Sequence, residues 1–109
     1  VEHVMSVIQS EGPFAGIIGF SQGSLLAAFV AKLYPEKFKF VILFGTFYYP
    51  IAPWPKVFKE PFDLPTLVLH GSSDNVVPLE KGREMALRLS TNSKFCEFDG
   101  RHVTPTSKD

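Results

Sequence analysis

The sequence predicts an α/β domain with a mostly parallel β-sheet and flanking helices. First, short and nearly all-apolar runs alternate with segments of strong helix formers, which is the pattern of consecutive βαβ units. Second, the chain has 109 residues, of which 45% are hydrophobic and 20% charged, as in an ordinary globular domain. Third, no internal repeat, low-complexity tract or linker interrupts it. We therefore expect residues 1–109 to form a single domain.

The first third of the chain predicts two helices with a strand between them. Residues 1–10 carry apolar side chains at helical spacing, and Gly12 with the proline after it ends this amphipathic helix. Residues 14–20, FAGIIGF, form a short apolar run that is typical of a strand buried on both faces of a sheet. Residues 22–33 are rich in leucine and alanine, which favours a helix that ends before Pro35.

The rest of the chain predicts three more strands and one more helix. Residues 38–45 form a second apolar run, and residues 46–65, with five prolines, form a long loop. A third strand is expected at 66–71, a helix at 79–90 and a fourth strand at 94–98. About four strands and three helices, with helices on both faces of the sheet, amount to part of a larger α/β fold.

Three reactive side chains follow three of the predicted strands. Ser21 comes directly after the first strand, Asp74 shortly after the third and His102 shortly after the fourth. Because the carboxyl ends of parallel strands lie at one edge of the sheet, we expect these side chains to meet there. Their order along the chain, Ser, Asp, His, is that of the catalytic triad in α/β-hydrolases.

Each residue type suits one step of nucleophilic catalysis. A serine hydroxyl is a weak nucleophile until a base takes its proton, and histidine titrates near neutrality and can do so. A carboxylate on the other ring nitrogen fixes the tautomer and stabilises the imidazolium. The alternative for Asp74 is a simple turn residue in GSSDN, and for His102 a surface histidine. Asp63 and Asp99 fit the acid position less well, because neither ends a predicted strand at the matching place.

The segment GFSQG predicts a sharp turn that holds the serine between strand and helix. Glycines at 19 and 23 remove side chains that would collide where the helix packs back on the strand. The helix start would aim backbone N–H groups at a developing oxyanion, and Gln22 N–H is one donor by position. The alternative is that Ser21 is only a small residue between a strand and a helix.

An aromatic loop and the acid loop are the candidates for a substrate pocket. The rings of residues 46–62 would line or cover an acyl group, and Phe47, Tyr48 and Val77 are the candidate lining residues. The alternative, that these rings only pack the domain, is equally open.

Composition excludes several other classes of protein. Eleven basic and eleven acidic residues give a net charge of zero, so nothing suggests a nucleic-acid partner. No apolar run is long enough to span a bilayer, and we expect no membrane partner. The single cysteine, Cys96, favours a reducing, cytoplasmic location and fits a buried strand as filler. The remaining histidines, His3 and His70, show no metal-ligand spacing; His70 fits a packed strand residue.

Three phrases of the chain resemble the eukaryotic serine hydrolase family called FSH, within the α/β-hydrolases. They are EGPFAGIIGFSQGSLLA at 11–27, PTLVLHGSSDNVVP at 65–78 and GRHVTP at 100–105. The resemblance implies Ser21 as nucleophile, Asp74 as acid, His102 as base and no cofactor. It implies hydrolysis of carboxylic esters of short to medium acyl chains, or of thioesters as in some fungal relatives. Arg101 stands where the family usually has a second glycine, and Ser24 where it often has alanine.

The same resemblance predicts that the front of the family domain, with its first strands and its second oxyanion donor, is absent from this chain. An open sheet edge would expose unpaired backbone groups and favour self-association. The leading hypothesis is a serine hydrolase that forms an acyl-enzyme from a small-molecule ester or thioester. A truncated, catalytically inactive protein with a binding role or no role is the alternative. An acyltransferase that uses the same triad is a third hypothesis.

Overall fold

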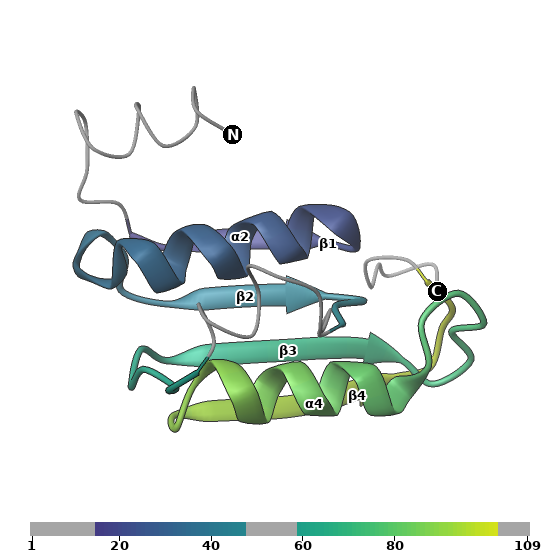
Figure 1. Cartoon of the computed structure of the whole chain (residues 1–109). Coiled ribbons are helices and arrows are strands. Elements are labelled where there is room, and N and C mark those ends of the chain that lie inside the picture. Colours follow the sequence, from purple (N-terminus) through teal and green to yellow (C-terminus); the bar gives the residue numbers. More distant parts are fainter. Residues whose placement is uncertain (1–14, 48–58, 103–109) are drawn as a thin grey trace.

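The computed structural model describes residues 15–47 and 59–102, and in them it confirms the α/β fold. Four parallel strands pair in sequence order: β1 (Ile17–Phe20), β2 (Val41–Phe44), β3 (Thr66–Gly71) and β4 (Ser93–Phe98). Helix α2 (Gln22–Leu33) and a 3₁₀ turn η1 (Pro35–Lys37) connect β1 to β2, and helix α4 (Leu79–Leu89) connects β3 to β4. The strands therefore all end at the same edge of the sheet (Figure 1).

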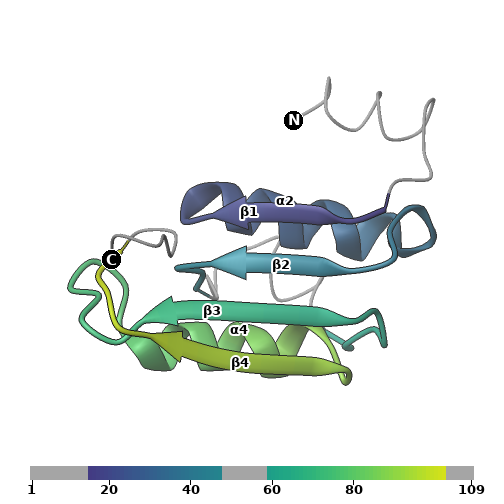
Figure 2. The same ribbon diagram turned by 180° about the vertical axis from the view of Figure 1, so that it is seen from behind.

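Both described helices lie on one face of the sheet. The third expected helix, at 1–10, lies outside the described residues, so helices on both faces stay a prediction. In Figure 1 α2 and α4 lie in front of the strands, and from behind, in Figure 2, the strands lie in front of both helices. The reason is handedness. Each βαβ crossover is right-handed, and both crossovers move in the same direction along a sheet whose strand order follows the sequence.

The core lies between these two helices and the sheet. Alternate residues of β2 and β3 point at the helices, because successive side chains of a strand face opposite sides. Small alanines on α2 bring that helix close to the sheet, and larger side chains of α4 fill the space over β3 and β4. The buried members include Ala27, Ala28, Val30, Ala31, Val41, Leu43, Val68, Met85, Ala86 and Leu89.

The opposite face of the sheet is only partly covered by the described residues. Ile18 is 63% exposed and Phe20 38% exposed, so β1 is not buried on both faces as its apolar run predicts. Cys96 is also half-exposed rather than buried, because β4 is the last strand of the described sheet. An apolar run therefore marks a strand correctly without stating whether a layer covers each of its faces.

The predicted boundaries agree best where a turn or a proline fixes them. The helix at 22–33 and the strand at 66–71 are confirmed as expected, and α4 ends one residue early. The first two strands are shorter than their apolar runs, because pairing between β1 and β2 begins only at Ile17 and Val41. The helix expected at 1–10 and loop residues 48–58 lie outside the described residues.

Candidate active site

Ser21 lies in a strained turn at the carboxyl end of β1. Its φ of 54° and ψ of −119° place it in a region that side chains other than glycine rarely adopt. Its N–H donates to the Phe44 carbonyl at 2.9 Å, and its own carbonyl accepts from the N–H of Ser24 at 3.0 Å and from the Ser24 hydroxyl. Ser24, at 0% exposure, therefore stabilises the turn from inside the first turn of α2.

The two glycines that flank this turn differ in their surroundings. A Cβ at Gly19 would lie 2.6 Å from the Gly23 oxygen and 2.6 Å from the Ser24 Cα, so the close approach of helix and strand requires this glycine. A Cβ at Gly23 would meet no atom within 4 Å. The expectation of a collision is confirmed at Gly19 and is wrong at Gly23, which faces away from the strand.

His102 connects Ser21 and Asp74 by two hydrogen bonds. Its Nε2 lies 2.8 Å from Ser21 Oγ, and its Nδ1 lies 2.6 Å from Asp74 Oδ2. Because a carboxylate can only accept, Nδ1 carries the proton, and Nε2 is left free to accept from the serine hydroxyl. The Phe20 ring packs beside the imidazole, with ring centroids 5.0 Å apart. The fold thus brings together three side chains that are far apart in sequence.

Asp74 is held by its own loop as well as by His102. Its Oδ1 accepts from the N–H of Val76 at 2.9 Å and of Val77 at 2.8 Å, and its side chain is 1% exposed. Burial alone would raise the pKa of Asp74. Hydrogen bonds from Val77 N–H, His102 and Val76 N–H outweigh it and hold the pKa of Asp74 below its usual 3.8. Asp74 therefore forms hydrogen bonds within its turn and also contacts His102, so a turn position does not exclude contact with the histidine.

This depressed pKa predicts a loss of stability in acid. The Asp74 carboxylate binds its proton more weakly in the folded protein than in the unfolded chain. Its contribution to the free energy of unfolding is therefore fully present above pH 3.8, the unfolded pKa, and is lost as the pH falls through the folded pKa. We expect the gap in unfolding free energy between the wild type and Asp74→Asn to be constant near pH 6 and to shrink below about pH 4. Urea titrations at several pH values measure it, and a gap that stays constant down to about pH 2 would contradict the prediction.

The acid loop and the histidine loop are joined through their backbones. Ser72 N–H donates to the Phe98 carbonyl and Ser73 N–H to the Gly100 carbonyl, each at 2.8 Å. A Cβ at Gly71 would overlap the carbonyl oxygens of Gly100 and Arg101, so this glycine lets the two loops cross in contact. The Arg101 side chain is exposed and forms no ion pair with Asp99 in the described part of the chain.

Gly45 is a site residue that the sequence analysis missed. It follows β2 directly, and its φ is +57°. A Cβ there would lie 2.8 Å from Cε1 and 2.9 Å from Nδ1 of His102. The only signal in the sequence is a glycine at the end of the apolar run VILFG, which by itself indicates no more than the end of a strand.

Replacing Gly45 with alanine is expected to displace His102 and to lower the reactivity of the Ser21 hydroxyl. The new methyl group overlaps the imidazole. In addition, an alanine is strained at the positive φ of this position. A displacement of about 1 Å costs about 100-fold in rate, whereas the strain costs about 1 kcal/mol of stability. The rate of Ser21 labelling by a serine-directed fluorophosphonate and the thermal unfolding of the variant separate these effects. Gly23→Ala, at a glycine with open space around it, is the matched control, and equal labelling rates of both variants would contradict the prediction.

The candidate pocket residues Phe47, Tyr48 and Val77 stay a prediction, because the structure describes only two of them. Phe47 is half-buried, Val77 is only 7% exposed, and Tyr48 lies outside the described residues. Gln22, the first residue of α2, is exposed beside Ser21.

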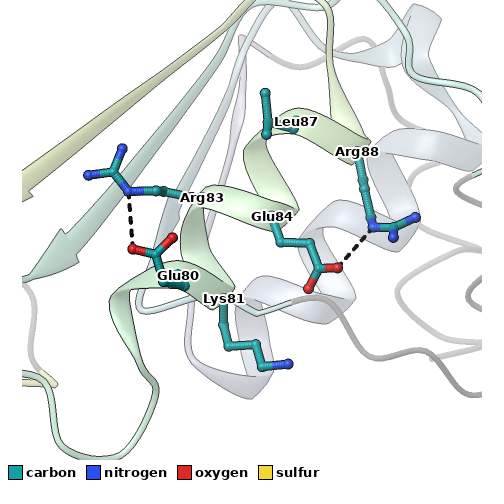
Figure 3. A pocket seen from close by; sticks show the side chains of 6 residues that line it. All are labelled: Glu80, Lys81, Arg83, Glu84, Leu87 and Arg88. Carbon is teal, nitrogen blue, oxygen red and sulfur yellow. Dashed lines mark hydrogen bonds and ion pairs between the residues drawn. The ribbon is translucent and has the colours of Figure 1, made fainter.

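One hollow, of about 590 Å³, lies on the outer face of α4 over the pairs Glu80–Arg83 and Glu84–Arg88 (Figure 3). Another, of about 360 Å³, lies at the amino ends of β2 to β4. Neither contains a residue of the Ser21–His102–Asp74 group.

Residues 15–47 and 59–102 contain neither a cluster of metal-binding side chains nor a membrane-spanning helix. No group of three histidine, cysteine or acidic side chains there could hold a metal ion. None of the helices in the same ranges has the length and apolar character needed to cross a bilayer.

Comparison with known proteins gives a consistent match. The model of the family described as serine hydrolase (FSH1) matches residues 1–109. Esterase OVCA2 of Danio rerio is 33% identical over 98% of this chain and 50% of its own, and Esterase FUS5 of Gibberella moniliformis is 33% identical over 100% and 47%. Acyl-protein thioesterase 2 of Zea mays superposes with a TM-score of 0.69 at 20% identity, over 95% of this chain and 56% of its own. The chain thus has an α/β-hydrolase fold and spans half or less of the length of such curated relatives.

Proposed function

Because the chain belongs to the serine hydrolase (FSH1) family, we propose that it carries the Ser21–His102–Asp74 triad of an enzyme that cleaves a carboxylic ester through an acyl-enzyme. The observation that carries the proposal is the unbroken series of hydrogen bonds from Ser21 Oγ through His102 to Asp74. Ser21, in its strained turn, is the nucleophile, His102 the base and Asp74 the acid. The names of the esterase relatives support an ester as the substrate.

In the first half of the reaction, Ser21 Oγ attacks the carbonyl carbon of the ester. Its proton passes to His102 Nε2, 2.8 Å away, while the carbonyl π electrons move to the oxygen and form an oxyanion. Asp74, 2.6 Å from Nδ1, stabilises the imidazolium that results. The intermediate then expels the alcohol oxygen, which takes the proton from Nε2, and the acyl group stays on Ser21 as an ester.

In the second half, water replaces the serine. His102 Nε2 takes a proton from the water as its oxygen attacks the acyl carbon, and returns that proton to Ser21 Oγ as the carboxylic acid leaves. We assign the N–H of Gln22 as one oxyanion donor, since it begins α2 next to Ser21 and the positive end of the helix dipole lies there. We also propose that Phe47 and Val77, the pocket candidates that the structure describes, line the acyl chain.

A fluorophosphonate probe tests the proposal directly, because it reacts with a serine only where a base activates the hydroxyl. The intact protein is expected to take one label, and Ser21→Ala is expected to take none. Ser73→Ala, which removes an exposed hydroxyl from the acid loop itself, is the matched control and should label normally. A folded wild-type protein that takes no label would favour the non-catalytic alternative and would contradict the proposal.

A further inference from the structure

His70 is a buried polar side chain to which the proposed triad assigns no role. It lies on the helix-facing side of β3 at 0% exposure. Its Nε2 is 2.7 Å from the carbonyl oxygen of Val77 and 3.4 Å from Asp74 Oδ2. The carboxylate oxygen that His102 contacts therefore has a second imidazole nitrogen within 3.4 Å.

The partners of His70 define which ring nitrogen carries the proton. The Val77 carbonyl can only accept, so Nε2 must donate. Nδ1 is buried and has no hydrogen-bond partner. A second proton there would be a buried donor without an acceptor, which costs more than an unpaired lone pair. Nε2 therefore carries the N–H, and this N–H points at the loop that holds Asp74.

Helix α4 has a glycine where it packs on the His70 ring. Gly82 is inside α4, where glycine is unfavourable. A Cβ at Gly82 would lie 2.7 Å from His70 Nδ1 and 3.0 Å from the Phe95 ring. The placement of the imidazole is thus over-determined by its neighbours, although it is too deeply buried to touch a substrate.

We propose that His70 is a positioning residue for Asp74. Its Nε2–H fixes the carbonyl of Val77, whose own N–H donates to Asp74 Oδ1, and it lies against Oδ2 as well. Both carboxylate oxygens are thereby held in the orientation that meets His102. The inference rests on the proposed function, since it assigns the part that His70 has in orienting the same triad.

The test uses two substitutions that differ in one donor. His70→Leu removes the N–H, while His70→Gln places an amide N–H near the position of Nε2. In the intact protein, the maximal rate of fluorophosphonate inactivation should fall roughly 10- to 100-fold in His70→Leu, the range expected for a displacement of about 1 Å or less. The half-saturating probe concentration should not change, and His70→Gln should recover most of the rate.

Two further variants keep the test independent of folding. Gly82→Ala pushes on the ring without altering its chemistry and should also slow inactivation. Met85→Ala, a buried change in the same helix away from the acid loop, should lower stability but leave the rate of the folded fraction unchanged. A His70→Leu protein that is inactivated at the wild-type rate, or a His70→Gln protein as slow as His70→Leu, would overturn the inference.

Hydrogen exchange gives a readout that does not need activity. Protection of the Val76 and Val77 amides, which donate to Asp74, should fall in His70→Leu and persist in His70→Gln. Unchanged protection in His70→Leu would overturn the positioning role even if the wild-type protein takes no label. An unlabelled wild type with the predicted change in protection would instead contradict only the proposed function.

Discussion

Ser21→Ala is expected to lower kcat for ester hydrolysis by about 10⁶-fold, the size of effect seen when a catalytic serine is removed from such a triad. Without Oγ no acyl-enzyme forms, and His102 has no hydroxyl to deprotonate. The fold should survive, because the backbone hydrogen bonds of the turn, from Ser21 N–H to Phe44 and from Ser24 to Ser21, do not use the hydroxyl.

The measurement is initial-rate hydrolysis of a short-chain activated ester, with thermal unfolding as the control for folding. Ser73→Ala should match the wild type in both. A Ser21→Ala protein that keeps more than a few per cent of the wild-type kcat would show that another group performs the reaction.

Asp74→Asn is expected to lower kcat by about 10⁴-fold with little change in the fold. The amide oxygen can still accept from Val76 and Val77, so the amide nitrogen faces His102 Nδ1. That nitrogen donates, and Nδ1 must then accept, which moves the imidazole proton to Nε2. In this tautomer Nε2 cannot take the proton of Ser21.

Steady-state kinetics of ester hydrolysis measure this loss. Asp63→Asn and Asp99→Asn, at the two other aspartates considered from the sequence, are matched controls. Both residues are exposed, and in the described structure the carboxylate that hydrogen-bonds to His102 is that of Asp74. Equal activity of Asp74→Asn and these controls would remove Asp74 from the proposed triad.

The elements and the edge of the site could be predicted from sequence, because local chemistry determines them. The run GIIGF followed by leucines and alanines specifies a strand and a helix, and the parallel order then places Ser21, Asp74 and His102 at one edge. The structure brings these three within hydrogen-bond distance, as the parallel arrangement predicts.

What could not be predicted depends on contacts between distant segments. Gly45 and Gly71 each leave room for the loop that carries His102, and no local pattern reveals a neighbour so far along the chain. Gly23 shows the opposite error, since a glycine in a motif was assigned a collision that the structure lacks. His70 was expected to be a packed strand residue, and its burial confirms this. Its hydrogen bond to the Val77 carbonyl could not be predicted, because it reaches a loop seven residues further along the chain.

Which face of the sheet the helices cover also could not be predicted from the sequence alone. The apolar residues of β1 predict a strand, but exposed Ile18 shows that apolar character does not reveal which face is covered. The handedness of the crossovers places α2 and α4 on one face, and this follows only once the strand order is known.

The most direct test of the proposed mechanism is to identify the acyl-enzyme itself. The intact protein would be mixed with an activated ester, quenched in acid within the pre-steady-state burst, digested and analysed by mass spectrometry. We expect the mass of the acyl group on the peptide that contains Ser21, and no such addition in Ser21→Ala. Turnover of the ester with no acyl group on Ser21, or with the acyl group on another residue, would contradict the account.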